Sequence, residues 1–160
     1  MQRTRLWTLA VSTLALAACN PFHREPVTEV SRDANVNSRW QASLVTPAAL
    51  VGAVQINGSA TMSPADNRDN TRLSLTLANA TPGGVHPWQV HRGQCGTDEG
   101  VFGSLDAYAP LKVGDEGKGS ASATIPGEAP TGGMYFVSVG ASTANPETIV
   151  ACGNLAPPAM

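Results

Sequence analysis

From Trp40 onward, the sequence consists of short stretches of β-forming residues that turn-forming residues interrupt at short intervals. In "TRLSLTLAN", residues 71–79, three leucines alternate with polar residues, so one side of the stretch is apolar and the other is polar. Breakers such as "SPADNRDN" and "PGEAPTGG" separate stretches of this kind. No window of helical length has the apolar spacing of an amphipathic helix. The pattern therefore predicts β structure throughout this part of the chain.

These stretches predict several strands within one domain that spans residues 40–155. The predicted strands cover residues 40–45, 51–62, 71–79, 87–92, 119–125, 134–140 and 147–152. A domain of this length can bury one core, and no internal repeat is evident. We expect an all-β fold in a single domain, either a β-sandwich or a flattened barrel.

Residues 1–18 have the composition of a secretory signal. A basic start, "MQRTR", precedes an apolar stretch that is too short to span a bilayer as a permanent helix. The stretch ends in "LAAC", residues 16–19, which resembles the lipobox of bacterial lipoproteins. This resemblance implies cleavage before Cys19 and attachment of lipid to that cysteine. The alternative is an ordinary signal peptide cleaved after an A-x-A-like site, which leaves Cys19 as a spare thiol.

Residues 19–39 are expected to form the lipidated cysteine and a flexible tether, because they are polar, contain two prolines and show no sustained periodicity. Residues 156–160 are expected to form a short C-terminal tail. No second apolar run of membrane length follows the signal, so the mature chain would be anchored rather than spanning. Asn20 is not the aspartate that retains some bacterial lipoproteins in the inner membrane. We therefore expect a location at the outer membrane, facing the periplasm.

The charge of the mature chain argues against nucleic acid as a partner. Removal of residues 1–18 takes away two arginines and no acidic residue, so the formal charge changes from −2 to −4. A mildly acidic surface does not attract a phosphate backbone. The expected partner is the membrane, through the lipid. A second copy of the chain or another envelope protein is a further candidate partner.

Two cysteines remain once Cys19 is assigned to lipid. Cys95 and Cys152 would lie in an oxidising compartment, where a disulfide between them is the default. Closing a loop of that length would stabilise the fold by about 4 kcal/mol on the chain-entropy model. Two free thiols, or a metal site with two cysteine ligands, remain as alternatives.

The stretch "PGGVHPWQVHRGQCG", residues 82–96, contains two of the three histidines in the chain. If "PWQVH" is a strand, Trp88 and Val90 share one face, while Gln89 and His91 share the other. Trp88 and Val90 are the apolar pair and are expected to enter the core. Gln89 and His91 are then expected on the outward face. His86 lies at the turn before the strand, an odd number of residues from His91, so its side chain is not expected on the same face as that of His91.

Two further stretches follow "PGGVHPWQVHRGQCG" in the chain, "VGDEGKG" at residues 113–119 and "IVACGNL" at residues 149–155. In this order the three stretches resemble the copper/zinc superoxide dismutases. The first is similar to the family's copper-binding signature, which leads to a disulfide cysteine, the second to its V-G-D segment, and the third to the segment with the second disulfide cysteine. The similarity covers residues 40–155, in the same order as in the family. It implies a Greek-key β-barrel with a Cys95–Cys152 bridge, and His86 as a loop fastener that binds no metal.

The resemblance does not carry over the family's metal centre. Gln89 replaces the first histidine of the copper pair, so His91 is the one copper-type ligand left, and Asp115 is the one zinc-type ligand left. Lys112 and Ile149 stand where the family has a zinc histidine and the arginine that guides superoxide. Three histidines, one of them in the tether, cannot supply the imidazoles and other donors that catalytic copper and structural zinc require.

We therefore expect a lipid-anchored envelope protein whose superoxide dismutase-like domain is a non-catalytic binding or structural module, with no catalytic residues and no resident cofactor. In this interpretation His91 is a solvated or hydrogen-bonded strand residue, and Asp115 caps a turn. One alternative is a periplasmic protein that handles copper or haem, in which His91 with Gln89, Asp115 or Met134 holds copper weakly. The other alternative is a divergent superoxide dismutase.

Overall fold

The computed structural model describes residues 39–158, and strands make up nearly all of their regular structure. The strands are β1 (Trp40–Val45), β2 (Asn57–Pro64), β3 (Asn70–Ala78), β4 (Val85–His86), β5 (Trp88–Gln94), β6 (Thr97–Val101), β7 (Leu111–Lys112), β8 (Gly119–Pro126), β9 (Tyr135–Ser142) and β10 (Asn145–Leu155). Two 3₁₀ turns are η1 (Ala48–Leu50) and η2 (Leu105–Ala107). The predicted signal peptide, Cys19, nearly all of the tether and residues 159–160 lie outside the described residues. Within residues 39–158, no helix has the length and hydropathy to cross a membrane.

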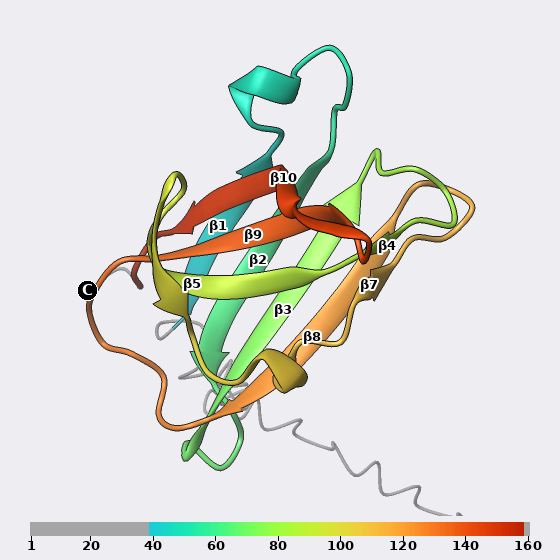
Figure 1. The fold of residues 1–160 in the computed structure, drawn as a ribbon. Helices are drawn as coiled ribbons and strands as arrows, with labels where there is room; N and C mark the ends of the chain where they lie inside the picture. Colours follow the sequence, from blue (N-terminus) through green and yellow to red (C-terminus); the bar gives the residue numbers. More distant parts are fainter. Residues whose placement is uncertain (1–38, 159–160) are drawn as a thin grey trace, which may run out of the picture. The chain divides into compact units, whose positions relative to one another are not determined.

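One antiparallel sheet contains eight strands in the order β6-β5-β9-β10-β1-β2-β3-β8, while β4 pairs with β7 in a small second sheet. The large sheet curls, so that β5, β9 and β10 lie across β1, β2, β3 and β8 (Figure 1). β3 and β8 are neighbours although β4, β5, β6 and β7 lie between them in the sequence, a crossing connection of the Greek-key kind. This arrangement confirms the predicted all-β class of sandwich or flattened barrel.

The core lies between the two halves of the curled sheet. Leu73, Leu75 and Leu77 of β3 are all buried, as their alternation with polar residues predicts. Trp40 and Trp88 are the two largest fully buried side chains. Each indole N–H donates to a backbone carbonyl oxygen at 2.9 Å, so neither leaves a polar group unpaired in the core.

The sequence prediction is wrong for two segments, residues 51–56 and residues 97–99. Residues 51–56 are predicted to begin a strand, but they belong to the loop between β1 and β2, where the N–H groups of Ala53 and Val54 bond back to the Leu50 carbonyl at 3.1 Å. Residues 97–99 fall in none of the predicted strands, but they begin β6, which pairs with β5. Because β6 is exposed along most of its length, no alternation of apolar and polar residues marks it.

β9 lies between β5 and β10 and is buried on both faces from Phe136 to Gly140. Gly140 has no room for a side chain, because a Cβ there would lie 2.5 Å from the Pro146 carbonyl oxygen and 2.9 Å from the Pro87 ring. One face of β9 packs into the core. The burial of the other face requires cover from outside that strand, and the β1–β2 loop and the turn between β5 and β6 lie on either side of it.

Candidate functional site

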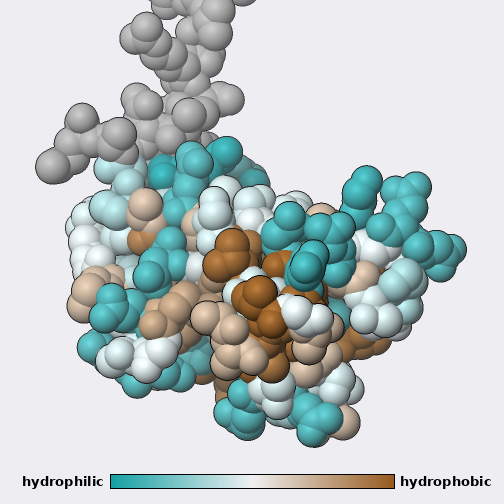
Figure 2. Space-filling model, turned by 90° about the horizontal axis from the view of Figure 1, so that it is seen from above, coloured by the Kyte–Doolittle hydropathy of each residue, from teal (hydrophilic) through white to brown (hydrophobic). Residues whose placement is uncertain are grey.

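A groove of about 1020 Å³ lies over the outer face of β5, β9 and β10. The loop from Thr46 to Val51 forms one wall, and the turn from Cys95 to Asp98 forms the other. Val45 and Val51 are 61% and 66% exposed, and with half-exposed Ile149 they make an apolar rim. Figure 2 views the side of the molecule that carries the β1–β2 loop and shows apolar residues near the middle of this face, with hydrophilic residues around them.

Strand register places the side chains of the groove floor. Gln89 of β5 is paired with Ser138 of β9, and Ser138 is paired with Cys152 of β10. In the next row on the same face, His91 is paired with Phe136. Directly opposite residues in antiparallel strands project to the same face of a sheet. These five residues therefore share the outer face, and all of them line the groove.

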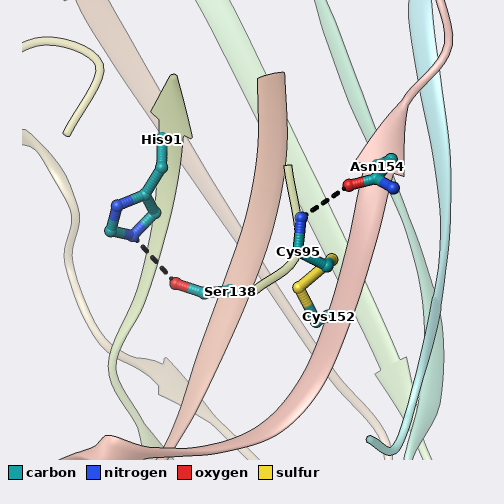
Figure 3. The surroundings of a disulfide bond; sticks show 5 residues. All are labelled: His91, Cys95, Ser138, Cys152 and Asn154. Atoms are coloured by element: carbon teal, nitrogen blue, oxygen red, sulfur yellow. Dashed lines mark hydrogen bonds between the residues drawn. A yellow bond between two sulfur atoms is a disulfide. The ribbon is translucent and has the colours of Figure 1, made fainter. Parts of the chain in front are cut away.

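A disulfide joins Cys95 and Cys152 and links the turn between β5 and β6 to β10 (Figure 3). The Cys95 N–H also donates to the Asn154 side-chain oxygen at 2.8 Å, which adds a second link between the same two segments. The default pairing expected from the sequence is thus present. It fixes one wall of the groove relative to the floor.

His91 differs from its prediction in one respect. Trp88 and Val90 are in the core, as predicted, and His91 is on the opposite face, but it is only 7% exposed. Its ring stacks on Phe136, with the centroids 4.8 Å apart, and β6 runs alongside it. The alternation of residues in a strand predicts which face a side chain is on. It does not predict what covers that face, and here the groove wall covers it.

Both ring nitrogens of His91 have hydrogen-bond partners. Nδ1 lies 3.0 Å from the Asp98 carboxylate, and Nε2 lies 2.9 Å from the Ser138 hydroxyl, the contact drawn in Figure 3. A carboxylate only accepts hydrogen bonds, so Nδ1 carries the proton. In the neutral ring, Nε2 then accepts the proton of the Ser138 hydroxyl. Serine, histidine and aspartate are linked in the order used by a nucleophile, a base and the group that orients the base.

The groove carries negative charge. The Gly100 N–H donates to the Asp98 carboxylate at 2.7 Å, and this bond, with a smaller effect of His91, holds the pKa of the Asp98 carboxyl below its usual range. The Asp98 side chain is 53% exposed, so water screens its charge. Glu147 is the second acid of the lining, which contains no lysine or arginine among the described residues. The groove therefore disfavours anions.

The other two predicted site residues lie away from the groove lining. His86 is 6% exposed, and its Nδ1 lies 2.9 Å from the Gly140 carbonyl oxygen, so it links β4 to β9. This is a contact of the kind that a loop fastener makes. Asp115 is exposed in the turn between β7 and β8. The groove brings His91 together with Ser138 and Asp98, and Asp115 is not part of it.

The donor set of the groove does not fit copper or zinc. His91, the predicted copper-type ligand, uses both ring nitrogens in hydrogen bonds. Across residues 39–158, no three His, Cys, Asp or Glu side chains converge where a metal ion could be held. Catalytic copper and structural zinc each need several such donors. No step of dismutase chemistry can be derived from these residues.

Sequence reasoning missed Ser138 and Asp98. Ser138 is the one polar residue within the apolar run "YFVSVG". Because side chains alternate along a strand, Ser138 projects to the face opposite Val137 and Val139, and this alternation is the signal that could have identified it. Asp98 carries no comparable signal, because it lies in a short exposed stretch. His91 connects Ser138 and Asp98 by hydrogen bonds, and the three residues lie on three different strands. The local sequence pattern does not predict the order in which strands lie in a sheet.

Comparisons with known proteins do not identify the chain. No protein-family model matches it, and no curated protein matches it. The resemblance to superoxide dismutases therefore rests on residues 82–96, 113–119 and 149–155 alone.

Proposed function

We propose that the chain is a lipid-anchored binding module of the bacterial envelope that holds a small neutral amphiphile in the groove. The observation that carries this proposal is a groove of about 1020 Å³ with an apolar rim and a polar floor. Sites for small molecules are concave, mostly apolar and equipped with a few polar groups that orient the ligand. The module would be a superoxide dismutase-like domain without that family's metal centre. Lipid on Cys19 would hold it at the outer membrane, facing the periplasm.

The rim favours an apolar ligand body. Val45 and Val51 face the groove while more than half exposed, and Ile149 lies beside them in the lining. Covering such side chains removes apolar surface from water, which is favourable by roughly 25 cal/mol per Å². The alkyl part of the ligand is therefore expected along the rim.

The floor favours a ligand head that is polar but uncharged. The Gln89 amide and the Ser138 hydroxyl offer hydrogen bonds next to each other, because the two residues are directly opposite in β5 and β9. Asp98 and Glu147 repel an anionic head, and no basic side chain of the described residues lines the groove to attract one. An alcohol or a carbonyl group meets these conditions better than a carboxylate.

The site is also rigid, which lowers the entropy lost on binding. Its floor consists of adjacent strands, and one of its walls is held by the Cys95–Cys152 disulfide. The side chains of a preformed site lose little conformational entropy when the ligand binds.

The proposal is tested by titrating the full chain, purified under oxidising conditions, with 1-octanol and with octanoate while binding heat is measured. We expect 1-octanol to bind more tightly than octanoate, because the lining is acidic. Val51→Asp adds a third acid at the rim and removes apolar contact. It is expected to weaken octanol binding about tenfold, which corresponds to about 1.4 kcal/mol.

Leu105→Asp is the matched control. Leu105 is 59% exposed in η2 and is not part of the groove lining. The control is expected to bind octanol like the wild type. Octanol binding that is absent in the wild type, or equally weakened by both substitutions, would overturn the proposal.

A further inference from the structure

We infer that Ser138 is a nucleophile that attacks neutral carboxylic esters held in the groove, with His91 as its base. This inference rests on the proposed function, because the ester must first occupy the groove. Its basis is the juxtaposition of Ser138, His91 and Asp98 from three adjacent strands on the groove floor and wall.

The three side chains have the connectivity that activates a serine. The Ser138 Oγ lies 2.9 Å from His91 Nε2, within the reach needed for a base to take the hydroxyl proton. The Asp98 carboxylate at 3.0 Å from Nδ1 fixes the tautomer that leaves Nε2 free to accept that proton. Stacking on Phe136, at 4.8 Å between ring centroids, holds the plane of the imidazole.

The Asp98 carboxylate is held by a second contact, to the Gly100 N–H at 2.7 Å. This contact fixes the carboxylate although its side chain is 53% exposed. Asp98 acts through His91 and touches no reacting atom, so it is a positioning residue. Its half exposure predicts a smaller effect than that of a buried aspartate, because water screens the charge that stabilises the imidazolium.

The substrate follows from the same surroundings. An ester carbonyl is uncharged and polar, so it suits the acidic groove, and its acyl or alkyl chain suits the rim at Val45, Val51 and Ile149. Gln89 is the cross-strand partner of Ser138, with the two Cβ atoms about 4.5–5.5 Å apart. Its amide N–H₂ is a donor of the type that stabilises the oxyanion of an acyl-transfer intermediate.

The reaction proceeds in two balanced halves. The Ser138 Oγ forms a bond to the ester carbonyl carbon while its proton moves to His91 Nε2. The bond from that carbon to the alcohol oxygen then breaks, and the alcohol leaves with the proton from Nε2. Water, deprotonated by Nε2, attacks the acyl carbon. The bond from that carbon to Oγ then breaks, and the proton on Nε2 passes to Oγ, which releases a carboxylic acid and restores the Ser138 hydroxyl and the neutral His91 ring.

The test uses an alkyl fluorophosphonate, which forms a stable bond to an activated serine oxygen with loss of fluoride. The full, oxidised chain is incubated with this probe, and peptides are mapped by mass spectrometry. We expect one adduct, located on Ser138. Ser138→Ala is expected to abolish it, while Ser122→Ala, at an exposed serine of β8 outside the groove, leaves its rate unchanged.

The variant Asp98→Asn tests whether Asp98 positions His91 for the reaction or only makes a structural contact with it. It is expected to slow labelling of Ser138 by about tenfold, and Asp98→Glu, which keeps the carboxylate, is expected to retain more of the wild-type rate. If the three residues serve only to fasten strands, Ser138 is labelled no faster than Ser122 in the wild type. That result would overturn the inference, as would an adduct at another residue.

The outcome also distinguishes this inference from the proposed function. Octanol binding that is sensitive to Val51→Asp, without an adduct on Ser138, overturns the nucleophile alone. Absence of both octanol binding and the adduct overturns the nucleophile and the binding module together.

Discussion

His86 joins two segments that lie far apart in the sequence. Its Nδ1 bonds to the Gly140 carbonyl at 2.9 Å, and Gly140 in turn donates its N–H to the Pro87 carbonyl at 2.8 Å. A carbonyl only accepts, so Nδ1 carries the proton, and Nε2 is left buried without a partner. The single hydrogen bond therefore has to offset the cost of burying a polar ring.

His86→Ala is predicted to lower the free energy of unfolding by about 2–3 kcal/mol, because it removes a buried hydrogen bond and leaves a cavity beside β9. Urea denaturation measures this change. Val85→Ala, at the neighbouring and partly exposed position, is expected to cost about 0.5 kcal/mol or less. Equal losses for the two variants would show that the His86 contact contributes nothing specific.

Copper binding is predicted not to depend on His91, because both ring nitrogens already have partners. Copper(I) and copper(II) titrations of the full chain and of His91→Ala are expected to give the same affinity. Tight copper binding that disappears in His91→Ala would mean that the imidazole leaves its hydrogen bonds for a metal. The copper-handling alternative would then replace the proposal made here.

At the residue scale, the sequence predicts which residues face the core better than it predicts the site. Trp88 and Val90 are where their alternation places them. The prediction for His91 gives the right face and the wrong exposure, since burial of an outer face depends on a wall contributed by another strand. Ser138 becomes a candidate residue only because β5, which carries His91, lies beside β9 in the sheet.

Among the elements, η2 is followed by Tyr108, a residue that packs against the core. Tyr108 is 7% exposed, packs edge-on against Trp88, and donates its hydroxyl proton to the Phe102 carbonyl. Burial disfavours the phenolate and raises the pKa of Tyr108 to about 12, from an ordinary value of 10.0.

Alkaline pH is predicted to destabilise the protein through Tyr108. Between pH 10 and about 12 the unfolded chain loses the phenol proton while the folded chain keeps it. Stability that is fully present below pH 10 is therefore lost as the pH rises, by on the order of 2 kcal/mol. Urea denaturation across this range should show the decline, and Tyr108→Phe should flatten it. An unchanged slope in the variant would assign the alkaline loss to other groups.

The hairpin of β5 and β6 is predicted to depend on its disulfide. Replacing Cys95 and Cys152 together with serine is expected to lower the free energy of unfolding by up to about 4 kcal/mol, since the bridge spans 57 residues. It is also expected to weaken octanol binding, because one wall of the groove is no longer tied to β10. Loss of stability with unchanged octanol affinity would show that the wall holds its position without the bridge.

Element boundaries follow the sequence where alternation is strong. β1 has the predicted bounds, and β3 starts and ends one residue before its prediction. The start of β2 is predicted too early, because the apolar residues of 51–56 pack within a loop. β6 is not predicted, since an exposed edge strand needs no apolar face.

At the scale of the whole described domain, residues 39–158, one large curled sheet is accompanied by the small β4–β7 sheet, and the outer face of the large sheet carries the site. The composition and turn spacing predict an all-β domain, and the structure agrees. They do not predict that β5 and β9 become neighbours, because β6, β7 and β8 lie between these two strands in the sequence. The groove forms only because these strands are adjacent and because the β1–β2 loop lies on one side of them and the β5–β6 turn on the other.

The central claim is that an amphiphile binds in this groove rather than on another apolar part of the surface. Intermolecular nuclear Overhauser effects between 1-octanol and the methyl groups of the full chain test it most directly. We predict contacts from the alkyl chain to Val45, Val51 and Ile149. Contacts confined to large exposed apolar residues outside the groove would contradict the claim, and within residues 39–158 these are Val85, Leu105 and Met134.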